Sequence, residues 1–260
     1  MNEKKVVFIG KYLRIKPRME VTDMREETNK KLIKVYTQWL TELFEKAPNL
    51  LGNVYSNPYY TSIPENWFES AGPRIMVVGE EGFGEWANGK GENVPVLPDE
   101  IEKIQSFNYS YLREQLRIDD GEINNSSFWR RFRKVAEYGV CCWTNIDKIH
   151  VRSNARCALS EKKRKLLHSV NTQVLFEEIS ILNPTHIIFF GWYGTSLRHE
   201  FPELYNQLYP GGAGDSSIWK NSVVPIKHEG RTYIFTYHPS YRSKDYEEKV
   251  MDVFRETLLQ

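Results

Sequence analysis

The chain has 260 residues, 40% of them hydrophobic, and a formal net charge of +1. This length and apolar fraction suffice for one sizeable α/β core and require no second domain. A charge this close to zero excludes a protein that attracts nucleic acid through its overall field, so any nucleic-acid partner needs a local basic patch.

The cysteines and the apolar runs indicate the cellular compartment of the protein. Cys141, Cys142 and Cys157 form no disulfide framework, because two of them are adjacent and cannot readily bridge to each other. The apolar run before Gly10 has only four residues, Val6 to Ile9, too few for a signal-peptide core. No run approaches the roughly 18 apolar residues of a membrane span. We therefore expect a cytoplasmic protein in a reducing setting.

The first part of the chain predicts a helix followed by an extended connection. Apolar residues recur at helical spacing within residues 30–46, with charged residues between them. Residues 47–73 contain four prolines and several aromatic residues, which is typical of a segment that wraps a core. We expect residues 1–73 to pack as an N-terminal extension on an α/β domain formed by residues 74–260.

Strands and helices alternate through this domain. The apolar runs predict strands near residues 74–79, 140–146, 186–190 and 232–236. Helical patterns fall near residues 100–117, 127–137, 160–182 and 245–259, with a short helix after Gly191. This alternation predicts a single-domain, three-layer α/β/α fold with a mostly parallel four-stranded central sheet.

Two motifs that directly follow predicted strands carry the candidate chemistry. The first is Gly79-Glu80-Glu81-Gly82-Phe83, a glycine-punctuated loop that holds carboxylates. The second is Tyr237-His238-Pro239-Ser240, where a strand ends on a histidine followed by a proline. In an open α/β sheet the loops at the carboxyl ends of the strands meet at one crevice. A carboxylate and a histidine placed there suit the hydrolysis of a glycosidic bond.

In their order along the chain, these motifs resemble those of the uracil-DNA glycosylase superfamily. The first resembles the superfamily motif that holds the water-activating group, and Thr144-Asn145 resembles the segment whose asparagine reads the Watson–Crick edge of the extruded uracil. Residues 183–191 are similar to the helix-to-strand passage before the last quarter of that fold. The final motif is similar to the one whose histidine contacts the base. The resemblance covers roughly residues 70–260.

The resemblance implies a monofunctional DNA glycosylase, without metal or cofactor, that flips a uracil or modified pyrimidine out of DNA and leaves an abasic site. A carboxylate would stabilise the oxocarbenium-like transition state and orient water, and a histidine would donate to the departing base. The implied catalytic residues are Glu81, with Glu80 as its alternative, and His238. The implied base-binding residues are Gly79, Phe83, Trp86 and Asn145.

Cationic and polar residues after the second and last predicted strands are the candidate DNA contacts. They are Lys148, Arg152, Arg156, Ser240, Tyr241 and Arg242. The first three lie where phosphates would run, and phosphate contacts position a protein without reading sequence. Ser240 belongs to the final motif, whose residues after the histidine press on the DNA backbone in relatives. Tyr241 and Arg242 follow it, where relatives insert a side chain into the helix vacated by the flipped base. We expect a monomer that binds DNA. We expect the cations of residues 130–134 to form a solvated helix face.

The chain departs from the usual motifs of this superfamily. Glu81 and Gly82 stand where the typical first motif has an aspartate and a proline, and no phenylalanine follows Gly79 by about a dozen residues to stack on uracil. One branch with a glutamate after the glycine holds an iron–sulfur cluster with four cysteines, which three cysteines cannot supply. The glycines after Glu81 suggest a wider pocket, for enlarged modified cytosines of phage DNA. A rotated Asn145 amide would suit cytosine.

Each candidate also has a reading without catalysis. The glutamates could be solvated loop residues or helix caps, and His238 a hydrogen-bonded residue at a sheet edge. Asn145 could form an Asx turn, and Phe83 and Trp86 could be core packing. Two other functions stay open: a DNA-binding or scaffold member of the same fold that has lost excision, and a nucleoside hydrolase. For a glycosylase, the biological role, DNA repair or defence against foreign DNA, also stays open.

Overall fold

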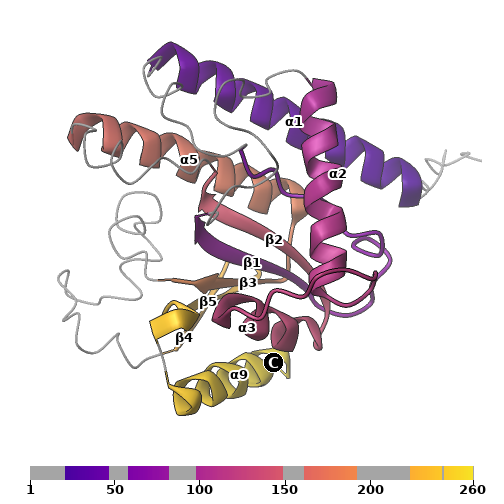
Figure 1. Cartoon of the computed structure of the whole chain (residues 1–260), viewed down its shortest axis with the longest axis vertical. Helices are drawn as coiled ribbons and strands as arrows, with labels where there is room; N and C mark the ends of the chain where they lie inside the picture. The colour runs from indigo at the N-terminus through magenta and orange to yellow at the C-terminus, as the bar shows by residue number, and fades with distance from the viewer. Residues whose placement is uncertain are drawn as a thin grey trace, which may run out of the picture.

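The protein has a mixed α/β fold built on a five-stranded sheet (Figure 1). The computed structural model describes residues 21–46, 58–81, 98–148, 161–191, 223–241 and 243–259. The predicted alternation of helices with a mostly parallel sheet is confirmed. The predicted number of four strands is wrong, because the described residues include a fifth strand at the edge of the sheet.

Most strands and helices begin and end close to their predicted positions, but α1 begins at Val21, nine residues before the predicted helix start at residue 30. The short helix predicted after Gly191 lies outside the described residues. The strands are β1 (Arg74–Glu81), β2 (Val140–Asp147), β3 (His186–Phe190), β4 (Val224–His228) and β5 (Arg231–Thr236). The helices are α1 (Val21–Lys46), α2 (Pro98–Gln115), α3 (Ser127–Ala136), α5 (Glu161–Leu182) and α9 (Lys244–Leu258), with a short 3-10 turn, η3 (Pro239–Tyr241). As far as the structure describes them, none of these helices combines the length and the apolar character needed to cross a membrane.

The strand order is β2-β1-β3-β5-β4, and among the strands that the structure describes only β4 runs antiparallel to its neighbour. β4 joins β5 through Glu229 and Gly230, which have φ angles of 49° and 74°. Two consecutive positive φ angles are typical of the tight turns that connect hairpin strands. The sequence pattern missed β4 because Pro225 interrupts its apolar run. Proline is tolerated there because an edge strand needs hydrogen bonds on one side only.

Side chains alternate along the central strands and fill two separate cores. On β1, Met76 and Val78 pack with α1 and α5, while Ile75 and Val77 pack with α3 and α9. Helices therefore cover both faces of the sheet, and strands that are buried on both faces are expected to be continuously apolar. Phe190, at the end of β3, belongs to the core shared with α3 and α9.

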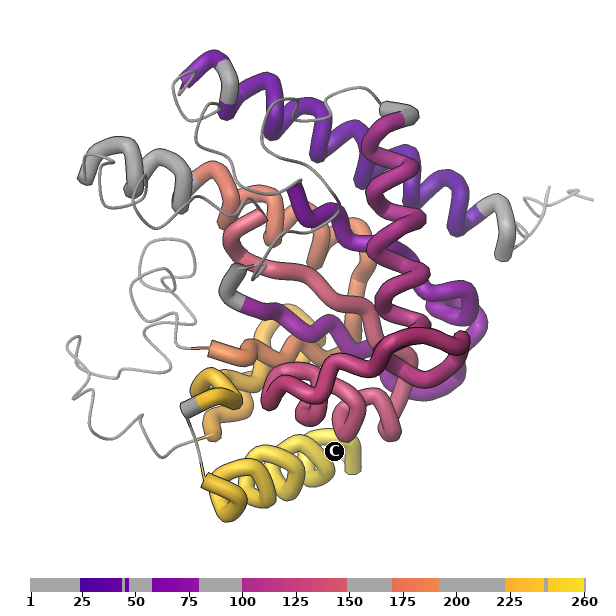
Figure 2. The backbone as a smooth tube through the Cα atoms, in the orientation of Figure 1, coloured from indigo at the N-terminus to yellow at the C-terminus, as the bar shows by residue number. Residues whose placement is uncertain are grey.

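The described part of residues 1–73 packs on the face of the sheet that α5 covers. Figure 2 shows α1 running alongside α5, with α9 on the opposite side of the sheet. Residues 58–67 contribute Tyr60, Ile63 and Trp67 to the same core. The indole nitrogen of Trp67 donates to the carbonyl of Leu182, 2.9 Å away, at the end of α5. This segment therefore anchors to the helix that leads into β3.

A buried ion pair connects this N-terminal part to the end of β2. The Lys148 ammonium and the Glu178 carboxylate are 2.5 Å apart, and both side chains are fully buried. Glu178 also accepts from the hydroxyls of Tyr36 at 2.6 Å, Thr61 at 2.9 Å and Thr144 at 2.7 Å. Burial lowers the pKa of Lys148, which the adjacent carboxylate opposes. The Glu178 carboxylate therefore accepts hydrogen bonds from three parts of the chain: α1, residues 58–67 and β2.

We predict that Lys148→Met destabilises the protein by about 3–5 kcal/mol, because it leaves the Glu178 carboxylate buried without its cation. Urea unfolding monitored by circular dichroism measures this change. Lys134→Met removes an exposed cation from α3 and is the matched control, expected to change stability by less than about 0.5 kcal/mol. Equal unfolding free energies for the two variants would contradict a buried, paired role for Lys148.

Candidate functional site

The sheet topology places the candidate site at the carboxyl ends of β1, β3 and β5. The connection after β1 leads to β2 on one side, and the connections after β2 and β3 lead to the other side. The switch point therefore lies between β1 and β3, where ligands bind in open α/β sheets. β1 and β5, the strands that lead into the two candidate motifs, both end at this edge (Figure 1). β3 separates β1 from β5, so two strand spacings, about 10 Å, divide the motifs.

Gly79 and Asn145 lie side by side at this edge. They are paired in the parallel register of β1 and β2. A Cβ atom on residue 79 would lie 2.4 Å from Oδ1 of Asn145 and 3.2 Å from Cε2 of Phe128. Any side chain at this position would collide with the asparagine amide, so the glycine of the first motif makes room for that amide.

The amide of Asn145 is fully buried and only partly satisfied. Its Oδ1 accepts a hydrogen bond from the indole nitrogen of Trp143, 3.1 Å away. Its Nδ2 has no hydrogen-bond partner among the described residues. The Asx-turn alternative does not describe Asn145, because this residue lies within β2 and its oxygen accepts from a side chain. An unpartnered buried donor is costly, which points to a ligand that accepts from it.

Phe128 is the aromatic residue that the sequence analysis missed at this site. Its half-buried ring lies against Gly79, and its centroid is 5.2 Å from that of Phe190 and 5.8 Å from that of Trp143. Phe128 lies in the first turn of α3, which Ser126 caps. A helix that leads into a parallel strand begins at the carboxyl edge of the sheet. The predicted start of this helix, just before β2, could have identified Phe128 from the sequence, because an aromatic ring in its first turn lies beside Gly79.

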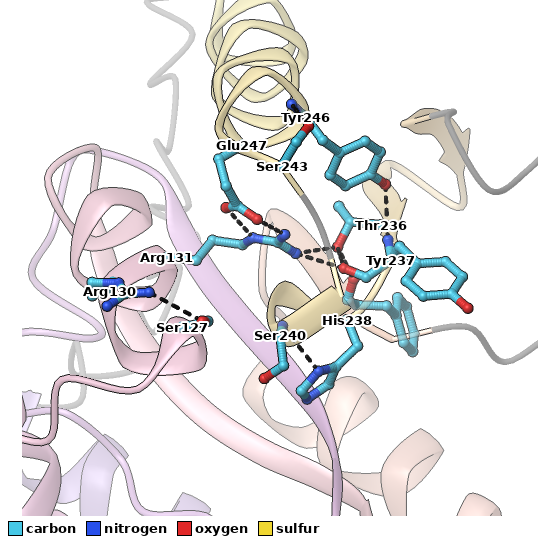
Figure 3. Close-up of polar contacts among 11 residues, drawn as sticks. Ser127, Arg130, Arg131, Thr236, Tyr237, His238, Ser240, Ser243, Tyr246 and Glu247 are labelled. Carbon is cyan, nitrogen blue, oxygen red and sulfur yellow. Dashed lines mark hydrogen bonds and ion pairs between the residues drawn. The ribbon is translucent and has the colours of Figure 1, made fainter.

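His238 follows β5 and is held in one tautomer. The backbone nitrogen of Ser240 donates to its Nδ1, 3.2 Å away (Figure 3). Because Nδ1 accepts, the proton of the neutral ring lies on Nε2, which is then a hydrogen-bond donor. Burial, and secondarily the nearby Arg131 guanidinium, lower the pKa of His238 below its usual 6.5. The imidazole is therefore neutral at pH 7.

Arg131 ties the segment before His238 to α9. Its Nη1 donates to the Tyr237 carbonyl at 2.7 Å and to the Thr236 hydroxyl at 2.9 Å, and its Nε donates to Glu247 at 2.7 Å (Figure 3). The side chain is only 1% exposed. The expectation that all cations of this helix are solvated is therefore wrong for Arg131, because α9 and the end of β5 satisfy its donors.

Lys148 requires a second correction. The sequence pattern predicted a rim residue that contacts phosphates, whereas the side chain of Lys148 is fully buried and paired with Glu178. Burial of the ammonium against a carboxylate removes it from any surface that DNA could contact. Ser240, by contrast, is exposed at η3. Of the candidate DNA contacts whose side chains the structure describes, it is the one that reaches solvent.

Several predicted site residues lie outside the part of the chain that the structure describes. They are Phe83, Trp86, Arg152, Arg156 and Arg242. For Glu80, Glu81 and Tyr241 the backbone is described, at the end of β1 and in η3, but the side chains are not. Within the described residues, no group of three or more His, Cys, Asp or Glu side chains could hold a metal ion.

Comparison with known proteins assigns no family to the chain. No protein-family model matches it. Comparison with curated proteins finds no significant match either. The candidate site is therefore interpreted from its own geometry and from the motifs.

We predict that Arg131→Met raises the pKa of His238, because it removes a positive charge that disfavours the imidazolium. Titration of the His238 ring signals by NMR measures the change. Arg131→Lys keeps the charge and is the matched control, expected to leave the pKa closer to that of the wild type. An unchanged pKa in Arg131→Met, with the fold intact, would show that Arg131 does not set the charge of His238.

Proposed function

We propose that the protein is a DNA glycosylase of the uracil-DNA glycosylase type, which extrudes a pyrimidine from DNA and hydrolyses its N-glycosidic bond. One observation carries the proposal: the unpartnered donor of Asn145 and the neutral histidine lie at the same edge of the sheet. The mixed α/β fold with its mostly parallel sheet and the order of the motifs support it. Enzymes that act on a base in DNA must first take it out of the stack.

The flipped base would be held between Asn145 and His238. The Asn145 amide would donate from Nδ2 to a carbonyl on the Watson–Crick edge of the base. The ring of Phe128, which lies against Gly79, would supply a stacking surface in place of the phenylalanine that relatives carry about a dozen residues after the motif glycine. The strand ends that carry Asn145 and His238 are three strand spacings, about 14 Å, apart. The two side chains, a pyrimidine and a hydrogen bond of about 2.9 Å at each end of the base together span this distance.

His238 would stabilise the departing base as negative charge develops on it. A neutral imidazole with its proton on Nε2 donates a hydrogen bond to the carbonyl oxygen of a pyrimidine anion. Such a preorganised donor acts mainly in the transition state. Because Arg131 holds the Tyr237 carbonyl, the histidine is positioned before the substrate arrives.

The carboxylate role belongs to Glu81, with Glu80 as its alternative. When the N–C1′ bond breaks, positive charge builds on the sugar and negative charge on the base. A carboxylate near C1′ stabilises the cation and orients the attacking water, as in other glycoside hydrolyses. Water then adds its oxygen to C1′, its proton goes to the carboxylate, and the released base leaves an abasic sugar.

We predict that the protein releases uracil from a uracil-containing oligonucleotide, and that His238→Ala slows release about 10²- to 10³-fold while DNA binding stays near normal. Strand scission after alkali measures release, and fluorescence anisotropy measures binding. His228→Ala, on the edge strand β4, is the control variant.

The same assay separates the competing functions. Retention on uracil-containing DNA without scission would indicate a non-excising binder. Release of bases from free nucleosides but not from DNA would indicate a nucleoside hydrolase. Equal losses of binding and release in His238→Ala would assign the histidine a structural role.

We predict that Glu81→Gln slows base release by about 10²-fold or more, since an amide cannot accept a proton from water, and that Glu80→Gln is milder. Single-turnover release from the uracil-containing oligonucleotide measures both variants. Glu137→Gln, on an exposed residue after α3, is the control. If Glu80→Gln proves slower than Glu81→Gln, the two roles are reversed, and normal release in both would remove the carboxylates from the mechanism.

A further inference from the structure

Trp143 controls how the Asn145 amide faces the pocket. The two residues are two positions apart on β2, so their side chains lie on the same face of the sheet. The Trp143 indole nitrogen donates to Oδ1 of Asn145, 3.1 Å away, inside the protein. An indole N–H can only donate, so the amide oxygen must face it. Rotation of the amide would set its NH₂ group against the indole N–H and leave two buried donors unsatisfied.

The indole itself cannot turn away to release the amide. Its ring centroid lies 4.3 Å from that of Tyr59, 4.9 Å from that of Trp129 and 5.8 Å from that of Phe128. Trp143 is 4% exposed, and the Tyr59 hydroxyl also donates to its carbonyl at 3.2 Å. Rings packed in this way have a single available orientation, because the core around them is close-packed.

This arrangement fixes the hydrogen-bonding pattern that a base meets. Nδ2 presents N–H donors, while the second lone pair of Oδ1 can accept. A base edge with a carbonyl beside an N–H group, as in uracil at O4 and N3, complements this pattern. A cytosine edge has an amino group beside an unprotonated nitrogen, so its amino group would face the Nδ2 donors of Asn145 and its nitrogen would face the Oδ1 acceptor. The rotated Asn145 amide that would suit cytosine would therefore break the hydrogen bond from the Trp143 indole.

We propose that Trp143 is a specificity-determining residue that restricts the pocket to bases with a 4-carbonyl and excludes cytosine and its enlarged derivatives. The proposal rests on the glycosylase function proposed above and refines its substrate class. Trp143 acts through Asn145 and does not need to touch the base. Substituents at C5 of a uracil are compatible with it, because they leave O4 and N3 unchanged.

The test compares release of uracil and cytosine from otherwise identical oligonucleotides by wild type, Trp143→Phe and Trp129→Phe. Trp143→Phe keeps an aromatic ring but loses the indole donor, so the amide can rotate. We expect the cytosine-to-uracil release ratio to rise at least about ten-fold, the scale of one satisfied buried hydrogen bond. Trp129→Phe removes a second indole from the same cluster and is expected to leave the ratio unchanged. An unchanged ratio in folded Trp143→Phe would overturn the proposal.

A second measurement, on the wild-type protein, keeps the proposal testable if Trp143→Phe does not fold. Oligonucleotides with a 2′-fluorinated nucleotide resist hydrolysis and carry a 4-oxo, a 4-hydrogen or a 4-amino pyrimidine. We expect binding to weaken in that order. Equal binding of the 4-oxo and 4-amino probes would overturn the proposed role of Trp143 and leave the glycosylase function standing. If no natural base is released from DNA, the glycosylase function itself is overturned.

Discussion

The close approach of Gly79 to the Asn145 side chain organises the carboxyl edge of the sheet. In the parallel register of β1 and β2 the amide oxygen occupies the space of a Cβ atom on residue 79. Because Gly79 has no side chain, the polar side chain of Asn145 fits inside the protein while its backbone remains part of β2. The Trp143 indole then fixes its direction, and Phe128 closes the space above Gly79.

One helix connects the two halves of the proposed site. Phe128 and Arg131 are three residues apart on α3, so they lie on the same face of that helix. Phe128 contacts the Gly79 and Asn145 half, and Arg131 holds the backbone before His238. The guanidinium is in turn held by Glu247 on α9 and lies over the Phe190 ring, 5.1 Å from its centroid. Movement of α3 would displace both halves together.

The N-terminal part of the chain supports the same edge from the other face of the sheet. Glu178 joins Tyr36 and Thr61 to Thr144 and Lys148, which flank Asn145 at the end of β2. A buried ion pair is weak evidence for stability by itself, because desolvation offsets its attraction. Its contribution here is positional, since the pair satisfies donors from three segments and holds the end of the strand that carries the base-reading amide.

The sequence by itself determined four of the five described strands and the approximate positions of the described helices, because apolar periodicity and turn residues are local properties. It also placed Gly79, Asn145 and His238 at one edge, since each follows or ends a parallel strand. It missed β4 because Pro225 hides a short edge strand. Tertiary structure alone decided that Lys148 and Arg131 are buried, that Phe128 lies over Gly79 and that the Asn145 amide is fixed. The physical reason is that a buried charge depends on its partner, and Glu178 and Glu247 lie 30 and 116 residues away in sequence.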